Sequence, residues 1–174
     1  MPLPRKKDDG SNGAPVLNIL RAHVRLLDVE EHTEPFTVTR KSDGATFTLD
    51  PQFKCTVEVL DDGQGGADNG AKFFEGFRYK QDKKGEWGNQ PYSKLGALTE
   101  VVKPGYFEND SIPDLTEDDL EAFEMVCSIK PSRNPKGAIT GSTIVWDTMQ
   151  ALPKKEKVAA AAVEEEDNFS DIPF

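Results

Sequence analysis

Residues 53–59 have the sequence FKCTVEV, in which apolar and polar side chains alternate strictly. Successive side chains of an extended chain point to opposite sides, so one face carries Phe53, Cys55, Val57 and Val59. The same parity continues backward to Leu49 and Phe47, with Pro51 marking an edge or a bulge. The stretch therefore predicts a β-strand that buries one face.

Two neighbouring stretches show the same period. In residues 21–26 the apolar Ala22, Val24 and Leu26 oppose Arg21, His23 and Arg25. In residues 72–81 one face holds Phe73, Phe77 and Tyr79, and the other holds Phe74, Arg78 and Lys80. Two later strands are predicted around Met125, Cys127 and Ile129 and over residues 139–146. The loop of residues 131–137 joins these last two strands.

Helical signals stand between the third and fourth of these strands. Leu95, Leu98 and Val102 have helical spacing in residues 93–102, and the helix should end before Pro104. A second, short helix should begin at Thr116, with Thr116 as N-cap and Asp119 at the N3 position that completes a capping box.

The order of elements predicts a mainly β fold: a five-stranded OB-fold-like barrel with a helical insertion between strands 3 and 4. Other small barrels also have five strands and a helix, so the pattern leaves them open. The domain prediction has four parts: a flexible arm (1–15), an OB-fold-like DNA-binding domain (16–150), a linker (151–163) and an acidic tail (164–174).

Composition narrows the class of protein. The 174 residues carry a net charge of −10 and only 36% hydrophobic residues, and mean hydropathy is −0.59. No apolar run approaches the about 20 residues that span a bilayer, and no apolar stretch follows the basic start, so we expect neither membrane insertion nor secretion. Cys55 and Cys127 stand far apart without a CxxC motif, which favours a reduced, cytoplasmic setting.

The negative charge is unevenly distributed. Residues 154–174 have a net charge of −3, which leaves −7 for the remainder, and residues 108–124 contain eight acids and no Lys or Arg. Residues 128–146, in contrast, contain three basic residues and no acid. A basic strip on the body is therefore compatible with the acidic total.

Aromatic and basic residues are interleaved between residues 72 and 107, the mixture that single-stranded nucleic acid requires for base stacking and phosphate contacts. Phe73, Phe77 and Tyr79 are interpreted as core, whereas Phe74, which shares its face with Arg78 and Lys80, suits either the core or a stacking role. Trp87 suits either a hairpin cap or a stacking platform. The predicted DNA-binding residues are Arg21, Arg25, Phe74, Arg78, Lys80, Trp87, Tyr92, Lys94, Lys130, Arg133 and Lys136.

Signals for catalysis are weak. Acids near Glu117 and Glu121 have the spacing of neighbours on a helix, yet acids at a helix N-terminus are favoured by its dipole without a metal. His23 and His32 have no nucleophile arranged with them, and no phosphate-binding glycine loop occurs. We expect no enzyme, no metal and no cofactor, with a metal-dependent nuclease as a distant alternative.

The last eleven residues, 164–174, have the sequence EEEDNFSDIPF. A solvated acidic tail needs no large apolar side chains, but this one carries Phe169 and ends in Ile172, Pro173 and Phe174. Apolar residues at the tip of an anionic arm are typical of a peptide that enters a partner's pocket.

This tip resembles the C-terminus of bacterial single-stranded DNA-binding proteins and of phage proteins that share it. The resemblance implies an OB-fold body that binds single-stranded DNA without sequence preference. It also implies that Asp171, Ile172, Pro173 and Phe174 recruit replication, recombination and repair proteins. Ser170 interrupts the acidic run and the linker is short and Lys/Ala-rich, which favours a phage-encoded or divergent version.

We therefore expect a protein that binds and protects single-stranded DNA in the cytoplasm of a bacterial or phage-infected cell, with a homo-oligomer possible. The alternative is an adaptor or inhibitor that does not bind DNA and uses the tail to occupy host partner pockets. The acidic body is the best support for that alternative.

Overall fold

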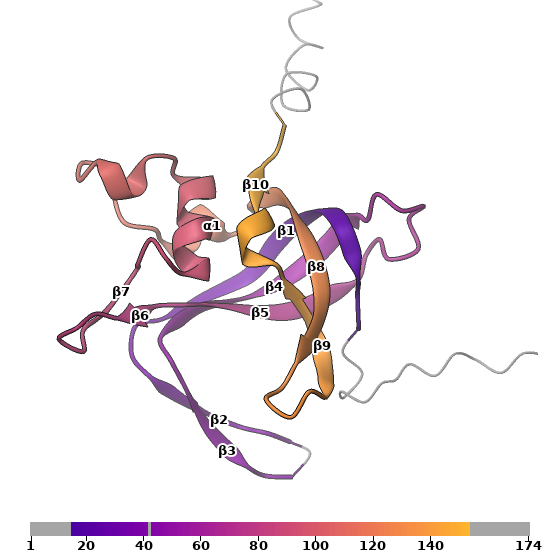
Figure 1. Ribbon diagram of the computed structural model, residues 1–174, viewed down its shortest axis with the longest axis horizontal. Coiled ribbons are helices and arrows are strands. Elements are labelled where there is room, and N and C mark those ends of the chain that lie inside the picture. Colours follow the sequence, from indigo (N-terminus) through magenta and orange to yellow (C-terminus); the bar gives the residue numbers. More distant parts are fainter. Residues whose placement is uncertain (1–14, 42, 154–174) are drawn as a thin grey trace, which may run out of the picture.

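The computed structural model describes residues 15–41 and 43–153 and is mainly β, with 44% strand and 14% helix (Figure 1). The main sheet is antiparallel and has the strand order β10-β8-β1-β4-β5, with β9 paired to β8. Its strands are β1 (Ile19–His32), β4 (Gln52–Asp61), β5 (Lys72–Arg78), β8 (Glu124–Arg133), β9 (Ile139–Ile144) and β10 (Gln150–Ala151). The long β1 pairs with both β4 and β8 and so forms the middle of the sheet.

Alternation along these strands places the core as predicted. Ala22, Val24 and Leu26 of β1 are buried, and so are the apolar members of residues 53–59 in β4 and Phe73 and Phe77 in β5. Met125, Cys127 and Ile129 of β8 complete this inner face. Burying each of these larger side chains contributes roughly 1.5–3 kcal/mol. One face of the sheet is thus committed to the core, which leaves the opposite side chains for the surface.

Residues 47 and 49 depart from the prediction that they continue the inner face of β4. They belong to β3 (Thr46–Leu49), which pairs only with β2 (Phe36–Thr39) in a separate hairpin. β3 ends at Leu49 and β4 begins at Gln52, with Pro51 between them. Phe47 is 41% exposed and so lies outside the core. Pro51, predicted to mark an edge or a bulge of one strand, instead lies between two strands of different sheets.

A second small hairpin, β6 (Lys80–Gln81) with β7 (Trp87–Gly88), follows β5. The helices come next: α1 (Lys94–Val102), the 3₁₀ helix η1 (Tyr106–Glu108) and α2 (Glu117–Leu120). The predicted capping box of Thr116 with Asp119 is present, and α1 has a cap that was not predicted, since Ser93 Oγ accepts from the Gly96 N–H. Residue 146, predicted as the end of the last strand, instead begins the 3₁₀ helix η2 (Trp146–Thr148).

A buried ion pair joins β5, α1 and β9. Glu75 lies on the inner face of β5 beside Phe73 and Phe77, and its Oε1 is 2.7 Å from Lys94 Nζ. The same oxygen accepts from the Ile144 backbone N–H at 2.7 Å and from Thr143 Oγ1 at 2.9 Å. Glu75 therefore links β5 to β9, two strands that are in contact but share no backbone ladder.

No helix within residues 15–41 and 43–153 is long and apolar enough to cross a bilayer.

Candidate nucleic-acid interface

Phe74 is a highly exposed aromatic residue on the outer side of β5. It is 75% exposed, because its neighbours Phe73 and Glu75 take the inner face of β5. Lys54, on the adjacent strand β4, places its Nζ 5.7 Å from the centroid of the Phe74 ring. Lys72 and Arg78 are exposed on the same side of β5. These four residues, Lys54, Lys72, Phe74 and Arg78, are called the β5 face.

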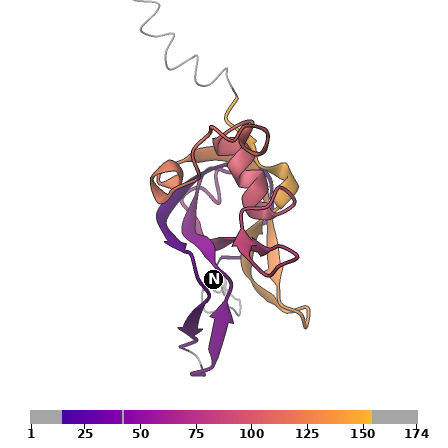
Figure 2. The same cartoon turned by 90° about the vertical axis from the view of Figure 1, so that its left-hand side faces the viewer.

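Two hairpins, β2–β3 and β8–β9, project from the molecule in the same direction. Figures 1 and 2 both show the β2–β3 and β8–β9 hairpins extending toward the bottom of the view, each beyond the main sheet. The β2–β3 hairpin carries Phe47, over which the Arg40 guanidinium lies 4.7 Å from the ring centroid. The β8–β9 hairpin carries the exposed Lys130, Arg133 and Lys136. Basic groups and a second aromatic ring thus stand on projecting ribbons.

Lys80 and Tyr92 meet in a shallow depression beyond the end of β5. Gln81, Asp82, Lys83 and Gln90 complete its lining. The Tyr92 ring is 91% exposed and therefore contributes little to packing. Trp87 is half-buried in β7, where it pairs with Gln81. The structure thus groups Lys80 and Tyr92, while Trp87 is in part a hairpin residue.

The basic stripe predicted on β1 is largely paired with acids. Arg25 donates from Nη2 to Glu58 Oε1 at 2.8 Å, and this hydrogen bond raises the pKa of Arg25. His23 Nε2 lies 2.8 Å from Glu124 Oε1. Arg21 is exposed and lines a small pocket with His23 and Asp61. Within the described part of the chain, this stripe therefore offers less uncompensated positive charge than the β5 face.

Lys94 lies away from these surfaces. Its ammonium group donates to Glu75 and to Thr143 Oγ1, as described above, and only about a quarter of its side chain is exposed (23%). This position suits an internal counter-ion for Glu75. Lysine pairs of this kind are retained because a buried carboxylate without a partner is costly.

Two carboxylates of the acidic segment before β8, Glu117 and Glu121, hold β1 by hydrogen bonds. The Glu121 carboxylate accepts the backbone N–H groups of Asp28 and Val29, at 3.1 and 2.9 Å, and Glu117 accepts that of Glu31 at 2.7 Å. Asp28 and Val29 lie at an irregularity of β1, where the register with β4 shifts and Asp28 has φ of 53°, whereas Glu31 pairs in register with Phe53. The Glu121 carboxylate therefore satisfies N–H groups that the bulge removes from the ladder. In residues 15–41 and 43–153 no group of three or more His, Cys, Asp or Glu is placed to hold a metal.

The two thiols are buried. Cys55 and Cys127 lie on the inner faces of β4 and β8 and form no disulfide. Burial raises the pKa of each thiol to about 12, so both remain protonated at neutral pH. A thiol in this state is a small apolar core residue, not a nucleophile.

Sequence reasoning missed Lys54, Phe47 and Arg40. Lys54 was detectable, since alternation in residues 53–59 places it opposite the buried Phe53 and Cys55. The contacts of Arg40 with Phe47 depend on the β2–β3 hairpin, which was not predicted. The predicted partner-binding residues Asp171, Ile172, Pro173 and Phe174 lie outside the described residues.

Compared with models of protein families and with curated proteins, the chain shows no match to either.

Proposed function

We propose that this protein binds single-stranded DNA without sequence preference and protects it, and that it performs no catalysis. The single observation that carries the proposal is Phe74, a large ring exposed on a β-strand with lysine beside it and further basic residues on the same side. Aromatic platforms with nearby cations bind single strands of any sequence, since every base has a π-face and every nucleotide a phosphate.

The arrangement of strands supports an OB-fold barrel as part of this proposal. β1, β4 and β5 would be its first three strands, β8 and β9 its last two, and the helices stand between the third and the fourth. Glu75 would close the barrel by linking β5 to β9. OB-folds bind oligonucleotides on the face of strands 2 and 3 and with the loops between strands 1 and 2 and strands 4 and 5. Those positions correspond here to the β5 face, the β2–β3 hairpin and the β8–β9 hairpin.

In this proposal a base stacks on Phe74, and phosphates lie along Lys54, Lys72 and Arg78. Tyr92 and Lys80 would extend the path at one end of β5. The basic residues of the β8–β9 hairpin would flank it, and Trp87 remains a candidate for a further stacked base. Lys94 and Arg25 are left out, because their charged groups are already paired with Glu75 and Glu58.

The proposal includes a second activity for the tail: its tip recruits proteins of DNA replication, recombination and repair. The support is the sequence itself, in which Ile172, Pro173 and Phe174 end an acidic run. An apolar tip enters a pocket while Asp171 and the terminal carboxylate contact basic residues at its rim.

The DNA-binding proposal predicts quenching of tryptophan fluorescence by single-stranded DNA. The full chain should be titrated with an oligo-dT of about 30 nucleotides, roughly twice the largest site of a single OB-fold. Saturable quenching should weaken with salt, with a slope of about −0.7 per phosphate neutralised. A duplex of equal length serves as the control and should bind more weakly. Absence of binding at low salt would overturn the proposal and favour the adaptor or inhibitor.

The tail proposal predicts that the tip alone competes for partner proteins. A peptide of residues 164–174 should displace the tail of a bacterial single-stranded DNA-binding protein from a purified host repair enzyme. The matched control is the same peptide without Phe174, which retains all the acids but loses the apolar end. Equal competition by the two peptides would contradict a pocket for Phe174 and indicate general electrostatic attraction.

A further inference from the structure

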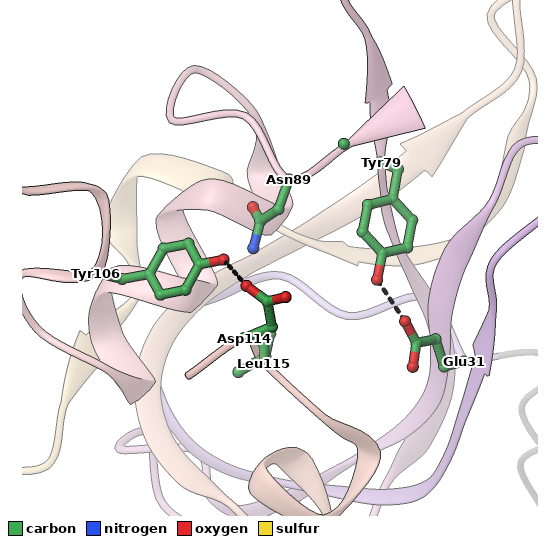
Figure 3. A pocket seen from close by; sticks show the side chains of 7 residues that line it. Glu31, Tyr79, Asn89, Tyr106, Asp114 and Leu115 are labelled. Carbon is green, nitrogen blue, oxygen red and sulfur yellow. Dashed lines mark hydrogen bonds between the residues drawn. The ribbon is translucent and has the colours of Figure 1, made fainter. Parts of the chain in front are cut away.

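A small polar pocket lies apart from the β5 face. It forms where the end of β1, the residue after β5, the segment after β7 and the loop before α2 meet (Figure 3). The pocket measures about 270 Å³. Its lining consists of Glu31, Tyr79, Gly88, Asn89, Tyr106, Asp114 and Leu115. None of these residues belongs to the proposed DNA-binding set.

Two tyrosine–carboxylate pairs face this pocket. The Tyr79 hydroxyl donates to Glu31 Oε2 at 2.5 Å, and the Tyr106 hydroxyl donates to Asp114 Oδ1 at 2.6 Å. Burial, followed by the bond to Glu31, raises the pKa of Tyr79, and the bond to Asp114 raises the pKa of Tyr106 to about 12. Both hydroxyls therefore keep their protons at neutral pH and direct them to the carboxylates.

The polar atoms that remain are mainly hydrogen-bond acceptors. Within the described residues, the tyrosine hydroxyls occupy one oxygen of each carboxylate, which leaves the second oxygens of the partly buried Glu31 and of the exposed Asp114 as acceptors. Asn89 donates from Nδ2 to Thr99 Oγ1 at 2.8 Å, which leaves its Oδ1 buried without a partner. Figure 3 shows the Asn89 side chain between the two tyrosines, with its amide nitrogen on the side of Asp114 and its oxygen turned away from that carboxylate. A buried acceptor without a donor is rare in native proteins and indicates a missing partner.

Among the described residues, no basic side chain lines the pocket beside its two carboxylates. Lys103 lies near the same loop, but its ammonium donates to the backbone oxygens of Pro113 and Asp114 and pairs with Asp119 at 3.1 Å. A group that pairs with these acceptors needs positive charge and several N–H donors.

We propose that this pocket receives the guanidinium group of an arginine side chain from a protein partner. A guanidinium has five N–H donors in one plane, so it can reach acceptors on several walls at once, and it also stacks on tyrosine rings. The pocket is smaller than the roughly 300–1,000 Å³ usual for small-molecule sites, which favours one inserted side chain. Its carboxylates would repel phosphate, so this contact is separate from DNA binding and stands whether or not the protein binds DNA.

The test is an NMR titration of the full ¹⁵N-labelled chain with three probes. These are the capped peptide Gly-Arg-Gly, its neutral citrulline analogue of almost identical shape, and spermidine. The arginine peptide should cause saturable shifts at the amides of Tyr79, Asn89 and Tyr106, and the citrulline peptide should not. Equal binding of both peptides, or of neither, would overturn the proposal. Tighter binding of spermidine than of the arginine peptide would identify a polyamine site instead and equally overturn it.

Variants make the assignment specific. Asp114→Asn keeps an acceptor for the Tyr106 hydroxyl but removes the charge. It should lower the affinity for the arginine peptide about tenfold. Glu31→Gln should act similarly on the Tyr79 side. The matched control is Asp110→Asn, since Asp110 is an exposed acid of the same segment that does not line the pocket. An equal loss in the control would show that the peptide responds to overall charge, and the proposal would fail.

Discussion

Replacing Phe74 with alanine should weaken oligo-dT binding by about 5- to 150-fold without destabilising the protein. The loss corresponds to the about 1–3 kcal/mol that one stacked base contributes. Stability should be unchanged because the ring is three-quarters exposed (75%) and its inner-face neighbours carry the packing. Fluorescence anisotropy of a labelled oligo-dT measures the affinity, and thermal unfolding measures the stability.

Two further variants separate stacking from general loss of surface. Phe74→Trp should restore most of the affinity, because any aromatic ring provides a platform. Trp146→Ala is the matched control: Trp146 is a 51% exposed aromatic residue on η2, outside the proposed path. If Phe74→Ala binds as tightly as the original chain, or if Trp146→Ala loses as much, the β5 face is not where bases stack.

Lys94→Met should lower the free energy of unfolding by about 3 kcal/mol or more, the usual result of removing one member of a buried ion pair. Glu75 is only 9% exposed, so its carboxylate would remain in the core without a cation. Chemical denaturation of the full chain measures the change. The matched control is Lys41→Met, an exposed lysine whose replacement should alter stability by no more than about 0.5 kcal/mol.

The double variant Lys94→Met with Glu75→Gln tests the reason for this loss. A neutral amide oxygen at residue 75 can still accept from the Ile144 N–H and Thr143 hydroxyl, which the carboxylate now satisfies. The double variant should therefore recover most of the lost stability. If it is no more stable than Lys94→Met alone, the loss comes from packing of the lysine stem and not from an unpaired charge.

Local alternation in the sequence was enough to predict the buried faces of β1, β4 and β5, but not the separate β2–β3 hairpin. Residues 21–26, 53–59 and 72–78 each bury the side chains of the predicted parity, because a period of two is a property of the extended backbone itself. The predicted Thr116 cap is equally local, since its hydroxyl bonds an N–H group three residues along the chain. The outward direction of Phe74 follows from the same parity.

Only the tertiary structure decided which charges are free. Glu75 has the parity of the core, and nothing near it in the chain shows that Lys94 is its counter-ion, because they meet only when α1 packs against β5. The sequence predicts Arg25 as a free surface cation, but in the fold it pairs with Glu58 of β4. The polar pocket likewise brings together residues that are far apart in the chain, from Glu31 to Leu115. By itself the sequence determined the inner faces of β1, β4, β5 and β8, the Thr116 cap and the acidic tip, all set by near neighbours. Pairing between distant charges depends on through-space distance, which only the packed fold determines.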